Sequence, residues 1–229
     1  MAINVNTVYQ TVLTILNKEQ RGYITPLEFN LLANQAQLET FEGYFAGLNE
    51  TIQLPGIDSP YADLTSILED KISVFQENIG TAQFASFPIA GANFRITLPD
   101  DIYRIVSLYV NDSEAEKLNH IHFAHVKKQG PLTRPTPITP VYNLQKNFLR
   151  IHNGSPVDPN GVDIGMHYIR KPIEPKWGYV VTNEQALYNA SSSTNFELHA
   201  SEEVALVAKI LGLAGIIMQK DLTGAPAQQ

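Results

Sequence analysis

The stretch VALVAKILGLAGIIM, residues 204–218, places the strongest constraint on the fold of this chain. Lys209 is its only charged residue, and its apolar side chains would cover nearly the whole circumference of a helix. A helix that is apolar all round must be buried all round. The stretch is too short to span a membrane. In a chain of 229 residues, we therefore expect this helix at the centre of a bundle or in an interface between subunits.

Two further helices are predicted near the N-terminus. Apolar residues recur at every third or fourth position over residues 5–17, and again over residues 61–77. This spacing places the apolar side chains on one face of a helix, and such a face packs against other elements.

A longer helix is predicted between these two, and its start is the best marked in the sequence. Thr25 and Glu28 form a Thr-x-x-Glu capping box, and Pro26 fits the first helical position. The side chains that follow form a seam at alternating spacings of four and three: Leu27, Leu31, Asn34, Leu38, Phe41, Phe45 and Leu48. Such a seam packs along another helix, either one of its own chain or one of a neighbouring copy.

The apolar period changes from helical to alternating after Phe87. Short strands are predicted over residues 94–98, 103–110, 120–126, 141–144, 148–151 and 164–170. Short turns between such strands indicate an antiparallel lobe. The predicted fold class is therefore α+β, a bundle of three N-terminal helices and the apolar C-terminal helix with an antiparallel β lobe inserted. The expected parts are 1–90 (bundle), 91–176 (β lobe) and 177–229 (linker, C-terminal core helix and loose tail).

Charge is distributed unevenly along the chain, whose formal net charge is −7. Residues 1–94 carry three basic and ten acidic side chains, whereas residues 117–157 carry no acidic side chain. The basic residues of that second stretch are Lys117, Lys127, Lys128, Arg134, Lys146 and Arg150. A basic lobe on an acidic body is expected where one face meets an anionic partner. A solvated, lysine-rich strand surface would give the same pattern.

His120, His122 and His125 form the only histidine cluster in the sequence. On a strand, His120 and His122 would share a face and suit a zinc or nickel ion. No carboxylate lies within the run to act as a base, and Lys127 and Lys128 would repel a metal. We expect exposed histidines without a metal, and we keep a metal-binding protein or metal-dependent enzyme as the alternative.

No sequence pattern indicates an enzyme. The chain has no cysteine, which excludes disulfides, thiolate zinc sites and cysteine nucleophiles. It also has no Gly-x-Ser-x-Gly, Walker-type or Gly-x-Gly-x-x-Gly motif. Residues 17–28 match the spacing of a calcium-binding loop, but Arg21 stands at a ligand position and the capping box explains Glu28. We expect no cofactor and no catalytic residue.

Five stretches carry a resemblance to a known family: LNKEQRGYITPLEFN (16–30), QAQLE (35–39), TLPDDIYR (97–104), YIRKP (168–172) and FELH (196–199). Together they resemble the head–tail connector proteins, also called adaptor or neck ring proteins, of short-tailed, crAss-like and related Bacteroidetes bacteriophages. The resemblance touches most of the chain, from about residue 12 to residue 218, although each stretch is short.

The resemblance implies a structural virion protein that forms a homo-oligomeric ring of about twelve copies in the phage neck. Such a ring joins the portal protein to other neck or tail proteins and surrounds the channel for double-stranded DNA. It implies assembly in the bacterial host cytoplasm, location in the virion and no membrane partner. The basic lobe would contact the portal protein or DNA phosphates, and we favour protein because DNA must slide through the channel. A tail receptor-binding protein is a further alternative.

Overall fold

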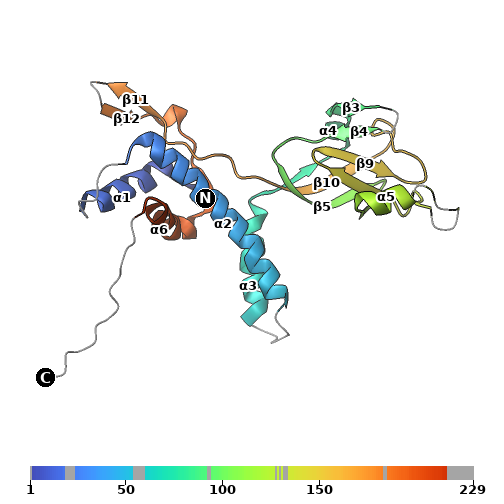
Figure 1. Ribbon diagram of the computed structural model, residues 1–229, viewed down its shortest axis with the longest axis horizontal. Coiled ribbons are helices and arrows are strands. Elements are labelled where there is room, and N and C mark those ends of the chain that lie inside the picture. Colours follow the sequence, from blue (N-terminus) through green and yellow to red (C-terminus); the bar gives the residue numbers. More distant parts are fainter. Residues whose placement is uncertain are drawn as a thin grey trace. The chain divides into compact units, whose positions relative to one another are not determined.

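The computed structural model (Figure 1) describes residues 2–18, 24–53, 60–91, 94–126, 128, 130, 134–182 and 185–215, with the backbone alone for 48–53 and 60–65. The chain divides into two compact units. Unit 1 comprises Met1–Val74 and Pro172–Gln229, and unit 2 comprises Phe75–Lys171. Unit 1 holds the long helices and unit 2 holds the two larger β-sheets, so the fold is α+β.

Four α-helices of unit 1 are α1 (Val5–Lys18), α2 (Pro26–Gln53), α3 (Pro60–Ser73) and α6 (Glu203–Leu213). The side chains that α1 buries lie on the predicted face: Val5, Val8, Tyr9, Val12 and Leu16. Helix α6 contacts both α1 and α2, and α3 contacts α2. The capping box forms as predicted, because the Thr25 N–H donates to the Glu28 carboxylate at 2.9 Å and the Glu28 N–H donates to the Thr25 hydroxyl at 3.3 Å.

The predicted seam of α2 is wrong in phase over its first half. Leu27 and Leu31 are 65% and 66% exposed, and Leu38 is exposed as well. The face that α2 buries consists instead of Phe29, Ala33, Ala36, Gln37, Phe41 and Tyr44. Small alanines in this face admit close packing against neighbouring backbone. Leu48, the last residue of the predicted seam, lies outside the described side chains.

Helix α6 is not buried all round, which corrects the expectation for the apolar stretch. It buries Leu206, Val207, Ile210 and Leu211, whereas Val204 on another face is 81% exposed. The helix ends at Leu213, so it is shorter than the apolar run. Residues 216–218 lie outside the described residues. The described part of the helix therefore packs through one stripe within its own unit.

Two small antiparallel sheets complete unit 1. Strand β1 (Ala2–Ile3) pairs with β13 (Phe196–His199), and short 3₁₀ turns (Ala190–Ser192 and Ala200–Glu202) flank β13. Strand β11 (Tyr179–Thr182) pairs with β12 (Gln185–Tyr188) to form a hairpin. This hairpin lies in the segment that the sequence analysis assigned to a linker.

Unit 2 consists of two sheets that enclose one apolar core, including Ile96, Leu108, Leu149, Ile164 and Met166. The first sheet has the order β2-β10-β5-β6 and the second the order β3-β4-β9-β8-β7. The strands are β2 (Gln76–Ile79), β3 (Ile89–Ala90), β4 (Arg95–Thr97), β5 (Ile102–Val110), β6 (Ser113–Glu114), β7 (Glu116–Lys117), β8 (Val141–Gln145), β9 (Phe148–His152) and β10 (Ile164–Arg170). Neighbouring strands are antiparallel except β7 and β8. A short helix, α4 (Thr81–Ser86), buries Phe84 against this core.

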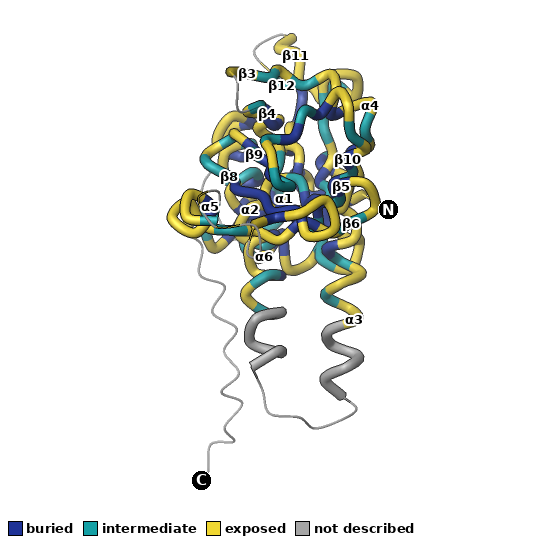
Figure 2. Tube along the Cα trace, turned by 90° about the vertical axis from the view of Figure 1, so that its right-hand side faces the viewer, coloured by how far each residue is buried: buried dark blue, intermediate teal, exposed yellow. Residues whose placement is uncertain are grey.

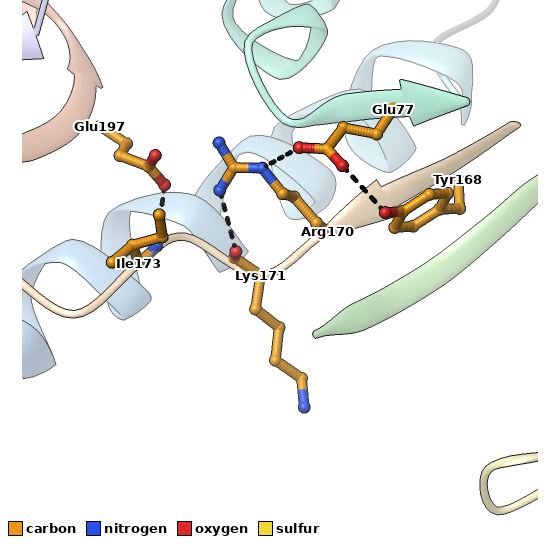
Figure 3. Close-up of polar contacts among 6 residues, drawn as sticks. All are labelled: Glu77, Tyr168, Arg170, Lys171, Ile173 and Glu197. Carbon is orange, nitrogen blue, oxygen red and sulfur yellow. Dashed lines mark hydrogen bonds and ion pairs between the residues drawn. The ribbon is translucent and has the colours of Figure 1, made fainter. Parts of the chain in front are cut away.

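Residues 76 and 77, expected at the end of the third helix, lie in strand β2 instead, and unit 2 begins at residue 75 rather than 91. Strand β2 pairs with β10, and the side chain of Glu77 on β2 binds two side chains of β10 (Figure 3). The Tyr168 hydroxyl and the Arg170 Nε both donate to the Glu77 carboxylate, at 2.9 and 2.7 Å. These sheet contacts override the apolar period that predicted a helix.

Residues 120–126, expected as a strand, form helix α5 (His120–Val126). The Asn119 side chain accepts from the His122 N–H at 2.8 Å, and its carbonyl accepts from the Phe123 N–H at 2.9 Å. Asn119 thus caps the first turn of the helix. Phe123 is buried, and its ring meets His152 edge-on. The helix packs on β8.

Candidate functional site

The hairpin of β11 and β12 exposes apolar side chains on both of its faces. We call its five large apolar residues the hairpin surface: Tyr179, Val180, Val181, Leu187 and Tyr188. Val181 is 65% and Leu187 53% exposed, and neither strand contains a charged residue. Figure 2 shows β11 as an exposed strand. A two-stranded hairpin is only marginally stable in water without a packing partner, so this surface has the character of a contact site.

The base of the hairpin is fixed by Trp177, which is buried. Its ring stacks on Tyr179 with centroids 5.8 Å apart, and it lies 4.2 Å from the ring of Tyr9 in α1. Its indole N–H donates to Asn6 at 3.0 Å. The hairpin is therefore attached to the helices of unit 1 through an aromatic cluster, while the remainder of its strands is exposed.

Helix α2 holds the extended segment before the hairpin through two polar side chains two turns apart. Asn30 exchanges two hydrogen bonds with the backbone of Trp177. Gln37, fully buried, donates to the Ile173 carbonyl at 2.8 Å and accepts from the Glu197 N–H at 3.1 Å. The Glu197 carboxylate accepts in turn from the Ile173 N–H at 2.8 Å (Figure 3). These bonds give the hairpin a defined starting point.

A second exposed apolar surface of unit 1 runs along α2. We call Leu27, Leu31 and Leu38 the α2 stripe; all three are exposed and lie on the predicted seam. Their spacing of four and seven residues places them on one side of the helix. An apolar stripe of this kind on a helix is typical of packing against another element. Within the described part of unit 1, no helix or strand of the chain covers the α2 stripe.

The six basic residues predicted for partner contact are spread over unit 2. Lys117 lies on β7, and Lys146 lies at the turn between β8 and β9. Lys128 follows α5, whereas Lys127 lies outside the described residues. Arg134 lines a pocket that Glu114 and Glu116 also line.

Arg150 is the one predicted basic residue whose surroundings the structure defines in detail. It lies on β9, and its Nη2 donates to the Gln145 Oε1 at 2.7 Å. The Gln145 Nε2 lies 2.6 Å from the His120 Nδ1. Burial, and then the nearby charge of Arg95, lowers the pKa of Arg150. Arg95 was not among the predicted residues, because it precedes the acid-free stretch and only strand pairing brings it close.

The histidine cluster does not form a metal site in the described part of the chain. His120, His122 and His125 lie on α5 rather than on a strand, so His120 and His122 do not share a face. No group of three His, Asp or Glu side chains among the described residues is placed to hold a metal ion. Glu28 of the calcium-like loop is engaged by Thr25, whose backbone and side-chain hydrogen bonds lower the pKa of the carboxyl group.

Comparison with known proteins finds no family model that matches the sequence and no curated protein that matches it. None of the helices among the described residues is long and apolar enough to cross a membrane.

Proposed function

We propose that this protein is a structural virion protein that forms a homo-oligomeric ring in the neck of a bacteriophage. The ring would join the portal protein to other neck or tail proteins and surround the DNA channel. The observation that carries the proposal is that unit 1 presents two separate exposed apolar surfaces, the hairpin surface and the α2 stripe. Exposed apolar surfaces of this kind mark protein–protein contact sites.

The occupant that we assign to each surface is the other surface on a neighbouring copy. Both are apolar, and the residues that form them carry no charge, so neither needs a charged partner. A contact between two different surfaces is heterologous, and its repetition closes a ring when the rotation between copies allows it. A two-fold dimer would instead require one surface to pair with itself.

The energy available from the hairpin surface is sufficient for weak to moderate association. Its five side chains are each roughly half exposed, so covering one would contribute about 1 kcal/mol. Each copy in a ring takes part in two such contacts, one through the hairpin and one through the stripe. A closed ring is therefore more stable than a single pair, since no contact is left open.

Unit 2 is the part that we assign to the anionic partners of the ring. Lys117, Lys128 and Lys146 are exposed on it. Exposed lysines without defined geometry suit contact with an acidic protein surface, such as the portal. Such contacts set association rate and orientation more than affinity.

The experiment that tests the proposal charges the hairpin. A variant with Val181→Lys and Leu187→Lys places a cation on each face of the hairpin, and both positions are exposed, so folding should be retained. The matched control is Val106→Lys with Ile138→Lys, two exposed apolar positions in unit 2. Analytical ultracentrifugation should find oligomers for the wild type and the control and monomers for the hairpin variant. Equal assembly of all three proteins would overturn the proposal.

A further inference from the structure

Two arginines lie side by side on one face of the second sheet of unit 2. Ile96 of β4 pairs with Leu149 of β9 in antiparallel register. Arg95 precedes Ile96 and Arg150 follows Leu149, so the register brings the two arginines opposite each other on the face that does not cover the core. Like charges in such positions repel each other.

No acidic side chain lies on the two strands that carry the arginines or on their direct neighbours; in this sheet Glu116 of β7 pairs with Val141, at the edge two strands away from β9. Strands β3, β4, β8 and β9 and helix α5 contain neither Asp nor Glu. The side chain of Arg95 is exposed, and its guanidinium makes no hydrogen bond or ion pair with any described residue. The Nε of Arg150 is buried without a hydrogen-bond acceptor. An anion from outside the chain that contacts Arg95 and the outer nitrogens of Arg150 would relieve the repulsion.

The surroundings hold Arg150 in one orientation. A guanidinium group only donates, so the Gln145 Oε1 is the acceptor of its Nη2 and the Gln145 Nε2 must donate to the His120 Nδ1. This assignment leaves the Nε2 of His120 as the protonated ring nitrogen. A preorganised guanidinium loses less entropy when it binds a planar or tetrahedral oxyanion.

From this geometry we infer that Arg95 and Arg150 form a binding site for a phosphate group of a nucleic-acid backbone. Two guanidinium groups match the oxygens of a phosphodiester, which they can bind through several charge-assisted hydrogen bonds. Phe148 is exposed on the same face of β9, two residues before Arg150, so this end of the face is accessible beside the part that α5 covers.

This inference deepens the proposed function and rests on it, because it assigns the DNA contact of the ring to two residues. The contact carries no sequence information, since only the backbone phosphate is bound. Two arginines per copy would form a weak contact for each copy, which suits a channel through which DNA slides. The six predicted residues did not include Arg95, so the site differs in composition from the basic lobe of the sequence analysis.

The test compares binding of a fluorescently labelled DNA duplex by anisotropy at several salt concentrations. The variant is Arg95→Gln with Arg150→Gln, and the control Lys117→Gln with Lys128→Gln removes the same charge from unit 2. We expect the arginine variant to weaken binding about tenfold and to lower the slope of log affinity against log salt by about 1. Equal losses in the two variants, or no loss in the arginine variant, would overturn the inference.

Two further arms separate this result from other outcomes. Inorganic phosphate should compete with the duplex more than an equal ionic strength of chloride does, but far less than an equal concentration of duplex phosphate; competition as strong as that of the duplex itself would assign the site to a free phosphate compound and overturn the inference. The same titrations on the Val181→Lys, Leu187→Lys background report the phosphate site in the monomer. A loss of arginine-dependent DNA binding in this monomeric variant would count against a site within one chain. Retention of that binding in a variant that no longer assembles would support the phosphate site independently of the ring.

Discussion

The side-chain amide of Asn30 pairs with the backbone of Trp177 as a neighbouring strand would. Its Oδ1 accepts from the Trp177 N–H at 2.7 Å, and its Nδ2 donates to the Trp177 carbonyl at 3.3 Å. One residue of α2 thus fixes the point from which the hairpin leaves unit 1. The hairpin surface owes its defined position to this pair and to the stacking of Trp177 on Tyr179.

Replacing Asn30 by Ala should therefore loosen the hairpin. The change leaves both polar groups of the Trp177 backbone without their partner and should lower the free energy of unfolding by about 1–3 kcal/mol. Hydrogen exchange of the amides in β11 and β12 should accelerate more than exchange in α1. The control is Gln35→Ala, an exposed side chain of the same helix that bonds only to Glu39. Equal exchange rates in the two variants would contradict this role of Asn30.

Replacing Gln37 by Leu should destabilise unit 1 although leucine has a similar size. Gln37 is fully buried and serves both the Ile173 carbonyl and the Glu197 N–H. Leucine would leave these groups unsatisfied in the interior, at a cost of about 2–4 kcal/mol in the free energy of unfolding. Chemical denaturation followed by the fluorescence of Trp177, the single tryptophan of the chain, measures this loss. A loss as small as that of an exposed Gln35→Leu variant would contradict it.

The stability of unit 2 should fall at alkaline pH through Tyr168. Burial, followed by its hydrogen bond to Glu77, raises the pKa of Tyr168 to about 12. The folded protein thus favours the neutral phenol, and this contribution is fully present below the unfolded pKa of about 10 and is lost as pH rises through about 12. Unfolding free energies measured across this range should fall less steeply for Tyr168→Phe than for the wild type. Tyr109→Phe, a tyrosine on the adjacent β5 without a bond to Glu77, serves as the control.

Charging the α2 stripe should prevent assembly and leave folding intact. Leu27→Glu together with Leu31→Glu changes two side chains that are about two-thirds exposed, so the free energy of unfolding should change by less than about 1 kcal/mol. Sedimentation should nevertheless find smaller particles than for the wild type. Mixing this variant with the hairpin variant should restore association, because the intact stripe of the hairpin variant meets the intact hairpin of the stripe variant. Rings from the stripe variant alone would contradict the heterologous contact.

Local signals in the sequence predicted part of the fold. The capping box of Thr25 and Glu28 and the valine spacing of α1 act over neighbouring residues, and the structure confirms both. The alternation that predicted strands near 103–110 and 164–170 also corresponds to β5 and β10. These patterns depend on the spacing of side chains over a few neighbouring residues, and that spacing can be read from the sequence.

Features that depend on distant contacts were not predictable in the same way. The side of α2 that faces inward is set by Asn30 and Gln37, whose partners lie more than one hundred residues away. Residues 120–126 form a helix because Asn119 caps it and Phe123 is buried against the ring of His152. The proximity of Arg95 to Arg150 follows from the pairing of β4 and β9. No local pattern contains these relationships.

The hairpin surface was the largest omission of the sequence analysis. Tyr179, Val180 and Val181 followed by Leu187 and Tyr188 have the composition of strands, and a short polar turn lies between them. This pattern indicates a hairpin, but the segment lies outside the predicted β lobe, in the predicted linker. The omission shows that a short hairpin in a helical unit has to be judged by its own residues.

The most direct measurement is native mass spectrometry of the purified protein over a range of concentrations. The account predicts one closed ring of identical copies, about twelve in number, with a mass free of any metal. A two-fold dimer, a monomer at every concentration, or a monomer with one bound transition metal would each contradict self-assembly through the hairpin surface and the α2 stripe.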